Sequence, residues 1–373
     1  MPTPAKDRVS LLIGGHVHSD WTRYRVDSDL LTPADAWQVD LAAPRIDLPA
    51  TVKAGSLAEV RVGSDIVMTG RIDEVDHQVG KTQHTLTLTG RDGAAVLVDC
   101  SAPIFSSKQI TLAEVVANVV KPLGVTRVRI DAVRTATYDK VHVDPCDTAW
   151  DVLTNAAEGS GLWPWFEPDG TLVIGGPDYT APPVASLILR RDGKGNNVVS
   201  LGRSESIAER YSEVTVLAQA HGTILENGKN AMRATAQDTG VNLYRPKIIV
   251  DHDAPTLASV QARARKVISD SRLRGMTLTA VVKGHRTSDG ALWKPGQRIH
   301  VLSEPHGLNG VYFLMGRRFE GGRGQVKGPT TTLTLKEDGV WVLDAHPHTK
   351  RKRHRKTIGP GEILPDNVLL GAS

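Results

Sequence analysis

The residue types best suited to metal binding occur near the N-terminus, in the stretch HVHSD. His16, His18 and Asp20 alternate along an expected strand, where every second side chain points to the same side, so their ligand atoms could converge. A tetrahedral site needs further ligands, and polar residues are common in exposed loops. The sequence therefore favours an exposed loop here. DHD (251–253) and HPH (346–348) raise the same question of a metal site, and the carboxylates of DHD are expected to serve the start of the long helix. We predict neither a bound metal nor a cofactor.

Catalytic signatures are missing from the sequence. The nucleophile elbow GxSxG, the zinc-protease motif HExxH and the phosphate-binding motif GxxxxGK[ST] do not occur, and RDGKGNN (191–197) has its glycines and lysine at the wrong spacing. Cys100 and Cys146 are the only cysteines, so they indicate two free thiols and exclude a disulfide framework. The motifs therefore identify no candidate catalytic residue.

Positive charge is concentrated in HTKRKRHRK (348–356). The whole chain has 45 basic and 41 acidic residues, but without the six cations of this stretch 39 basic residues face 41 acidic ones. A body of net charge −2 does not attract nucleic acid as a whole. We call these six residues the basic cluster: Lys350, Arg351, Lys352, Arg353, Arg355 and Lys356.

The basic cluster has two interpretations. It could contact nucleic acid through a salt-dependent, sequence-independent attraction, or it could be a solvated extension that contacts an acidic partner. No aromatic residue interrupts the cations, which argues against a stacking platform for single strands. The following TIGPGEILPDNVLLGAS (357–373) is apolar again, which is typical of a tether to another chain.

The N-terminus does not resemble a signal peptide, because its apolar run is only a few residues long. No stretch approaches the ~18–20 apolar residues that a membrane helix requires. We therefore expect no membrane segment and a protein made in a cytoplasm-like compartment.

Most of the chain alternates apolar and polar residues, which is typical of strands with one buried face. Residues 8–98 and residues 276–337 form two such β units of similar size, each expected to be a barrel or a sandwich. Strand patterns also occur between 184 and about 220. The fold class is thus predicted as mainly β with a small α+β insertion.

Two shorter helices are expected in the insertion. In 110–124, the apolar residues share one face, Thr111 is the expected N-cap and Gly124 follows the C-terminus. In 147–161, Trp150 begins a buried stripe, and Asp169-Gly170 then forms the turn of a hairpin.

The longest expected helix covers 254–275, with Asp253 or Thr256 as its N-cap and Gly275 at its C-terminus. Its inward residues are predicted to be Leu257, Val260, Ala264, Val267 and Ile268.

Several motifs occur in an order that resembles a known family. The chain is similar to the baseplate hub proteins of Mu-like contractile-tailed phages, which are related to tail-spike hub and type VI secretion spike hub domains. The motifs that carry the resemblance are TGRIDEV (69–75), GRDGAAVLVD (90–99), DTAWDVLTNAAEGSGLWPWFEPDGTLVI (147–174), RYSEVTV (210–216), ARARKVISDSRLRG (262–275) and LWKPGQRIHVLSEPHGLNGVYFLMGRRFEG (292–321).

The resemblance implies a multidomain hub fold with two tube-like β-barrels and a small α/β domain. Its expected domains are a first barrel of residues 1–99 with 184–222, an inserted α/β domain of 100–183, a connecting segment with the long helix of 223–275, a second barrel of 276–343, and a basic tail of 344–373.

The resemblance also implies a structural protein of the virion tail baseplate, with no enzyme activity, assembled in the bacterial cytoplasm. The expected form is a homotrimer whose six barrels form a ring between the tail tube and the central spike, with DNA in transit through its channel. The expected partners are the spike, a tail tube or distal tube protein and other baseplate proteins. The basic cluster is expected to contact one of them.

Seven residues of these motifs are expected to have structural roles. Gly70 and Gly90 are predicted at turns with positive φ, and Trp293, Pro295 and Gly296 at the start of a barrel strand. Asp92 and Trp150 belong to the same motifs.

Two alternatives stay open from the sequence: a tail-associated cell-wall hydrolase, and a nucleic-acid-binding protein acting through the basic cluster. The hub motifs leave no remainder of ~100 residues for a catalytic domain.

Overall fold

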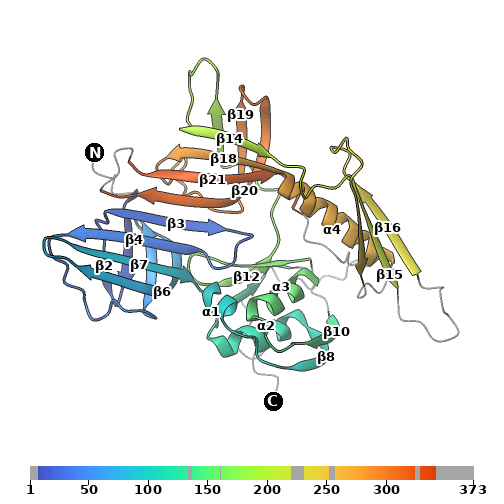
Figure 1. Ribbon diagram of the computed structural model, residues 1–373, viewed down its shortest axis with the longest axis horizontal. Coiled ribbons are helices and arrows are strands. Elements are labelled where there is room, and N and C mark those ends of the chain that lie inside the picture. The colour runs from blue at the N-terminus through green and yellow to red at the C-terminus, as the bar shows by residue number, and fades with distance from the viewer. Residues whose placement is uncertain are drawn as a thin grey trace.

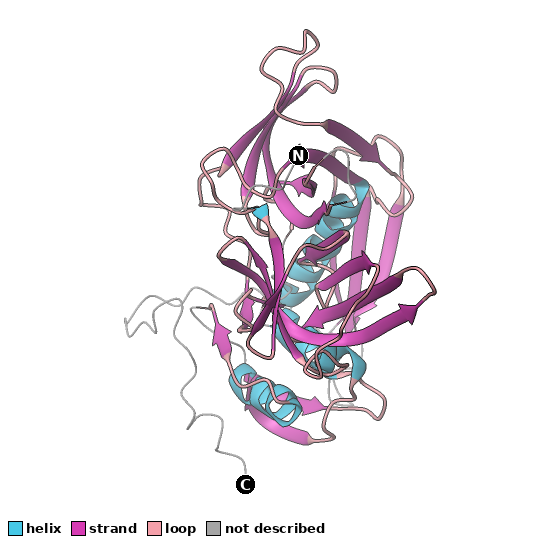
Figure 2. Cartoon of the chain, turned by 90° about the vertical axis from the view of Figure 1, so that its left-hand side faces the viewer, coloured by secondary structure: helices cyan, strands magenta, loops and turns pink. Residues whose placement is uncertain are grey.

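The computed structural model describes residues 7–132, 137–159, 161–219, 231–251, 257–323 and 328–341. Strands form most of its regular structure, and helices are a minority (Figure 1). The expected fold class, mainly β with an α+β insertion, is confirmed. The side view shows the same predominance of strands (Figure 2). None of the described helices is both long and apolar enough to cross a membrane.

The first strands form what we call the N-terminal β unit. Alternate side chains face its core, as the two-residue period of a strand requires: Trp37 and Val39 are buried on one strand, and Leu86 and Leu88 on its neighbour. The strands are β1 (Val9–Ile13), β2 (His16–His18), β3 (Arg23–Asp29), β4 (Ala36–Ala43), β5 (Leu57–Val62), β6 (Asp65–Val79) and β7 (His84–Asp92).

The C-terminal β unit contains β18 (Met276–Lys283), β19 (Arg298–Ser303), β20 (Leu308–Gly321) and β21 (Thr330–Glu337). Its strand β20 pairs antiparallel with β3, from Gly316 opposite Asp29 to Gly321 opposite Tyr24. This pairing, which we call the seam, joins both β units into one 13-stranded sheet. Figure 1 shows β3 and β20 side by side.

Two further strands, β13 (Ala185–Leu189) and β14 (Ser200–Glu205), pair with the C-terminal β unit. Strand β13 runs parallel to β19, and β14 runs antiparallel to β18. Residues 184–222 were predicted to belong with 1–99, whereas β13 and β14 pair with strands of the C-terminal β unit. Alternation along a strand encodes which face is buried, whereas the identity of the neighbouring strand depends on contacts distant in sequence.

In the sequence, a module of helices and short strands lies between the two β units, and we call it the α/β module. Thr111 caps the second helix with a reciprocal capping box to Glu114, and Gly124 follows with φ 83°. Both expectations are confirmed, as is the hairpin turn, where Gly170 has φ 83°. The elements are α1 (Ala94–Asp99), β8 (Ser106–Thr111), α2 (Leu112–Val120), the 3₁₀ helix η2 (Lys121–Leu123), β9 (Val128–Ile130), β10 (Thr137–His142), α3 (Ala149–Gly159), β11 (Trp163–Phe166) and β12 (Leu172–Gly175).

The long helix α4 (Leu257–Gly275) packs on a three-stranded sheet of β15 (Glu213–Gln219), β16 (Ala231–Gln237) and β17 (Pro246–Asp251), in the order β16-β15-β17. We call these four elements the α4 module. Val260 and Ala264 are buried against this sheet, as predicted.

The N-terminal end of α4 differs from its prediction at one residue. Leu257 is 48% exposed, so its predicted burial is wrong: it is the first residue of the helix, and the buried contacts with the sheet begin one turn later, at Val260. The expected caps Asp253 and Thr256 lie outside the described residues.

The roles predicted for Gly70 and Gly90 were wrong. Both glycines lie within strands, β6 and β7, and neither has positive φ. They are required for a different reason, since a Cβ atom at Gly70 would lie 1.9 Å from the backbone oxygen of Arg91, and one at Gly90 would lie 2.4 Å from the ring of Trp37. Only glycine allows these backbones to approach so closely.

Candidate functional site

The modules meet around a small enclosed space of about 50 Å³, which we call the junction cavity. The N-terminal β unit contributes carboxylates, the α/β module contributes aromatic rings, and the C-terminal β unit contributes cations. The lining includes Ser28, Asp29, Asp35, Asp92, Trp150, Trp165, Phe166, Glu167, Lys294, Pro295 and Arg317.

Two carboxyl groups of the junction cavity are held by local hydrogen bonds. The Ser28 hydroxyl and the Asp29 N–H, the latter at 3.0 Å, donate to Asp35. Asp92 accepts the N–H of Ala94, the first residue of α1, at 2.9 Å. Loss of solvent around Asp35 raises its pKa to about 6, and burial raises the pKa of Asp92 well above its usual range.

Arg317 supplies the positive charge beside these acids. Its side chain is buried, its guanidinium lies 4.0 Å from the ring centroid of Phe319, and one Nη donates to the Val26 carbonyl at 3.4 Å. Burial lowers its pKa to about 10, so the group stays charged at neutral pH. Its Nε atom has no hydrogen-bond partner in the described structure. The arrangement is a buried charge cluster that connects the modules.

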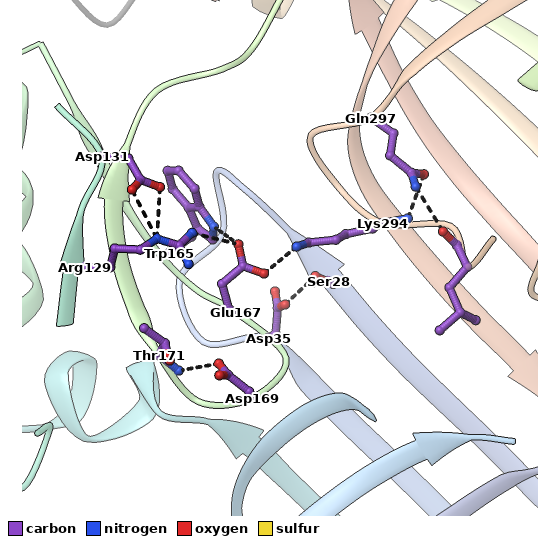
Figure 3. A network of polar contacts seen from close by, with 11 residues as sticks. Ser28, Asp35, Arg129, Asp131, Trp165, Glu167, Asp169, Thr171, Lys294 and Gln297 are labelled. Carbon is purple, nitrogen blue, oxygen red and sulfur yellow. Dashed lines mark hydrogen bonds and ion pairs between the residues drawn. The ribbon is translucent and has the colours of Figure 1, made fainter. Parts of the chain in front are cut away.

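A polar network links the C-terminal β unit to the α/β module (Figure 3). Lys294 forms an ion pair with Glu167, which also accepts a hydrogen bond from the indole N–H of Trp165 at 3.4 Å. Arg129 lies 3.7 Å from the same carboxylate and pairs with Asp131. These contacts fix the loop before β19 against strand β11.

An aromatic contact ties the end of the described chain to the same junction. The rings of Trp163 and Trp341 meet edge to face, with centroids 6.2 Å apart. The indole N–H of Trp163 donates to the Leu30 carbonyl at 2.6 Å, and the Tyr179 hydroxyl donates to the Trp341 carbonyl at 3.0 Å. Leu273 of α4 belongs to the same apolar cluster, so all four modules are connected.

Three residues singled out from the sequence meet at the junction cavity: Asp92, Trp150 and Pro295. Gly296, with φ 91°, occupies the turn before β19, and its N–H donates to the Leu314 carbonyl at 2.8 Å. Trp293 is buried nearby in sequence, at the same turn.

The basic cluster and HPH (346–348) lie outside the described residues. His16 is exposed on β2, and Asp20 follows with φ 68°. Among the residues that the structure describes, no group of three or more His, Cys, Asp or Glu side chains could hold a metal ion.

Sequence reasoning missed Asp35, Arg317 and the pair of Lys294 with Glu167. The burial of Arg317 could have been predicted, because Arg317 is two residues before the apolar Phe319 in a strand and its side chain therefore points to the same, buried face. Asp35 and the ion pair had no such signal, since their partners are distant in sequence.

Several strands of the 13-stranded sheet have an edge without a described partner, among them β2 and β13, which each pair with one strand only. Strand β14 pairs only with β18, and lies at one end of the sheet order. Strand β6 pairs with β5 up to Arg71, and beyond Ile72 it pairs only with β7, so Glu74 to Val79 also expose an edge. Unpaired edges are ready to pair with another chain.

The solvent face of the sheet at the seam is polar and close to neutral. Threonines alternate on it with buried leucines, and a groove of about 510 Å³ crosses the seam there. Asp27 forms ion pairs with both Arg25 and Arg318. The groove is lined in part by Arg25, Asp27, Thr279, Arg318, Thr332 and Thr334.

Family models match four consecutive ranges of the chain. Residues 8–92 match the N-terminal domain of the Mu phage baseplate assembly protein GpP-like family, and residues 94–176 match the second domain of the gp44-like baseplate hub protein. Residues 210–268 match the third domain of the NMB1110-like tail protein, and residues 270–340 match a tail protein C-terminal domain.

The chain is also similar to whole proteins. It is 26% identical over 321 residues to the baseplate hub protein gp44 of Escherichia phage Mu, covering 83% of this chain and 82% of that protein. The tail protein from Neisseria meningitidis MC58 superposes with a TM-score of 0.80 at 40% identity, covering 91% and 99% of the two chains.

The 43 kDa tail protein of prophage MuSo2 from Shewanella oneidensis has the same fold, with a TM-score of 0.78 at 22% identity and coverage of 90% and 99%. The matches cover the N-terminal β unit, the α/β module, the α4 module and the C-terminal β unit in the same order. The chain therefore belongs to the family of baseplate hub proteins of Mu-like phages, and it is a structural component of the phage tail.

Proposed function

We propose that the protein is a homotrimeric hub that joins the tail tube to the central spike and surrounds the channel through which DNA passes. Each chain has two β units, so three chains supply six, which suits a connection between a six-fold tube and a three-fold spike. The observation that carries the proposal is the seam, because it makes the two β units of one chain a single continuous sheet with unpaired strand edges in both units.

Two of the free edges support ring closure. They belong to different strands, β14 in the C-terminal β unit and the Glu74–Val79 part of β6 in the N-terminal β unit, so contact between them is heterologous. A heterologous contact repeated around an axis closes into a ring when the rotation permits. Pairing β14 of one protomer with β6 of the next would satisfy both edges.

The solvent face at the seam supports a role as channel wall. Its threonines and its ion-paired Arg25, Asp27 and Arg318 give little net charge, so passing DNA would not be retained by phosphate contacts. The role needs no catalytic group. The proposed partners are the spike, a tube protein and other baseplate proteins in the virion tail, after assembly in the host cytoplasm.

The test is the solution mass by light scattering over a range of protein concentration and salt. A trimer has a mass of about 120 kDa, three times the chain mass of 40.2 kDa. A ring with a central pore in electron micrographs would support the geometry. A monomer in the presence and absence of the spike protein would overturn the proposal.

A matched pair of variants tests the edge. The N–H of Ser206 donates to Gly275 at 2.9 Å, so by the two-residue period the N–H of Arg203 points away from β18. Arg203→Pro removes that outward donor, whereas Arg203→Ala keeps it, and both lose the ion pair with Glu205. We expect a trimer for the alanine variant and a monomer for the proline variant, with the same circular dichroism spectrum.

A further inference from the structure

The open face of the α4-module sheet carries exposed aliphatic side chains. Its other face packs against α4 through Val214, Val216 and Ile249, whereas Ile248 and Val250 on β17 are 65% and 58% exposed. Leu217, opposite Val250 in the register, is 37% exposed on the same side. A row of exposed aliphatic residues on one sheet face marks an interaction surface.

The same strand also exposes its edge. Strand β17 is the last strand in the order β16-β15-β17, and it pairs only with β15 among the described residues. Its outer N–H and C=O groups are therefore available to a further strand. In Figure 1 this sheet lies at the other side of the molecule from β3 and β4, so the surface is separate from the seam.

The charges around β17 indicate which kind of peptide segment could bind to this surface. Arg233, opposite Leu217 on β16, is exposed on the open face. Lys247 on β17 is also exposed, but it points to the α4 side, where its Nζ lies 5.7 Å from the centroid of the Tyr211 ring. The acids nearby are already engaged, because Asp251 lies 4.0 Å from Arg263 and Glu213 accepts a hydrogen bond from Gln237. The surface therefore suits an extended segment with aliphatic residues and carboxylates and without cations.

We propose that residues 366–371 of the same chain, DNVLLG, occupy this surface as a fourth strand beside β17. The surrounding sequence GEILPDNVLLG (361–371) has Glu362 and Asp366 and no Lys or Arg. The segment has six residues, as Pro246–Asp251 has. In parallel pairing, Val368 would lie beside Ile248 and Leu370 beside Val250. This inference does not depend on the proposed trimer.

The connection has a suitable length. The described chain ends at Trp341, and the Ser269 hydroxyl of α4 donates to the Val340 carbonyl. From Ser269 to Leu257 the helix spans ~18 Å toward the three-stranded sheet. A random coil with the length of residues 342–365 would have a root-mean-square end-to-end distance of ~25–30 Å. A linker whose length is close to the span gives a high local concentration of the segment at β17.

The experiment is disulfide trapping in the full chain with Cys100→Ser and Cys146→Ser. Ile248→Cys, at a site 65% exposed on β17, is combined with Val368→Cys, and the matched control combines Val79→Cys, a site 67% exposed on β6, with Val368→Cys. We expect the β17 pair to form an intrachain disulfide at least about tenfold faster than the control pair. The readout is the linked tryptic peptide in mass spectrometry.

Equal rates for both pairs would overturn the proposal, and so would a disulfide that forms only between two chains. Hydrogen exchange gives a second readout that requires no cysteine. Val368→Ser with Leu370→Ser should speed exchange of the β17 amides, whereas Leu369→Ser, on the opposite face of the segment, should change it less. Unchanged exchange in both variants would also contradict the proposal.

Discussion

The backbone N–H of Asp92 donates to the carbonyl oxygen of Asp35 across 3.0 Å, which places the carboxyl groups at the end of β7 and just before β4 at one cavity. Both have raised pKa values because the protein removes their solvent. Since the cavity lies where the modules meet, the charge of these two carboxyl groups affects the stability of the contacts between the modules.

Stability should fall as pH rises from about 4 to about 6. The pKa of Asp35 is about 6 in the folded protein and ~3.9 when unfolded, so the folded state holds a proton that the unfolded state has released. The stabilisation is complete below the unfolded pKa and lost above the folded one. Asp35→Asn should flatten this part of the stability curve by on the order of 1 kcal/mol, measured by urea unfolding. Asp47→Asn, at an exposed site, is the control and should leave the slope unchanged.

Replacing Arg317 with Met should destabilise the protein by about 2–4 kcal/mol at pH 8, because the change leaves the nearby carboxylates without their buried cation. The loss should be smaller at pH 5, where Asp35 holds its proton. The double variant Asp35→Asn with Arg317→Met should recover part of the stability at pH 8. Equal losses at both pH values would show that packing, not charge, is responsible.

Gly70→Ala should cost more than about 2 kcal/mol or prevent soluble expression, because the new Cβ would overlap the Arg91 backbone in the neighbouring strand. Gly202→Ala in β14 is the matched control, since the atom closest to its added Cβ would be 3.9 Å away. Thermal unfolding of both variants measures the difference. Similar melting temperatures would contradict the close approach of β6 and β7.

Trp341→Ala should lower the free energy of unfolding by about 3–5 kcal/mol and expose the junction to proteases, because Trp341 packs on Trp163 and Phe313 between modules. Tyr244→Ala, at a side chain that is 79% exposed, should change stability little. Urea unfolding and limited proteolysis give the two readouts. Unchanged proteolysis of the tryptophan variant would mean that the modules are held together elsewhere.

Replacing the six cations of the basic cluster with Gln should leave the oligomeric mass unchanged and weaken binding to an acidic baseplate partner. Binding measured at 50 and 200 mM salt should lose its salt dependence in the variant. The same preparation tests the nucleic-acid alternative, which requires that the wild-type protein bind duplex DNA and that the variant lose this affinity. DNA binding that is the same in both proteins would exclude the basic cluster as its source.

Much of the local structure could be read from the sequence because it depends on neighbours within a few residues. The cap at Thr111, the helix end at Gly124 and the turn at Gly170 follow from backbone preferences and short-range hydrogen bonds. Alternation of apolar residues predicted the mainly β class, because the side-chain period of a strand is fixed.

The tertiary structure decided which of these elements meet. The seam between β3 and β20, the pairing of β14 with β18, and the convergence of Asp35, Asp92 and Arg317 all join residues far apart in the chain. Gly70 and Gly90 show the same limit, since their role depends on the neighbouring strand and the Trp37 ring rather than on their own φ angles. A period of two specifies a buried face, but the partner of that face depends on the packing of the whole chain.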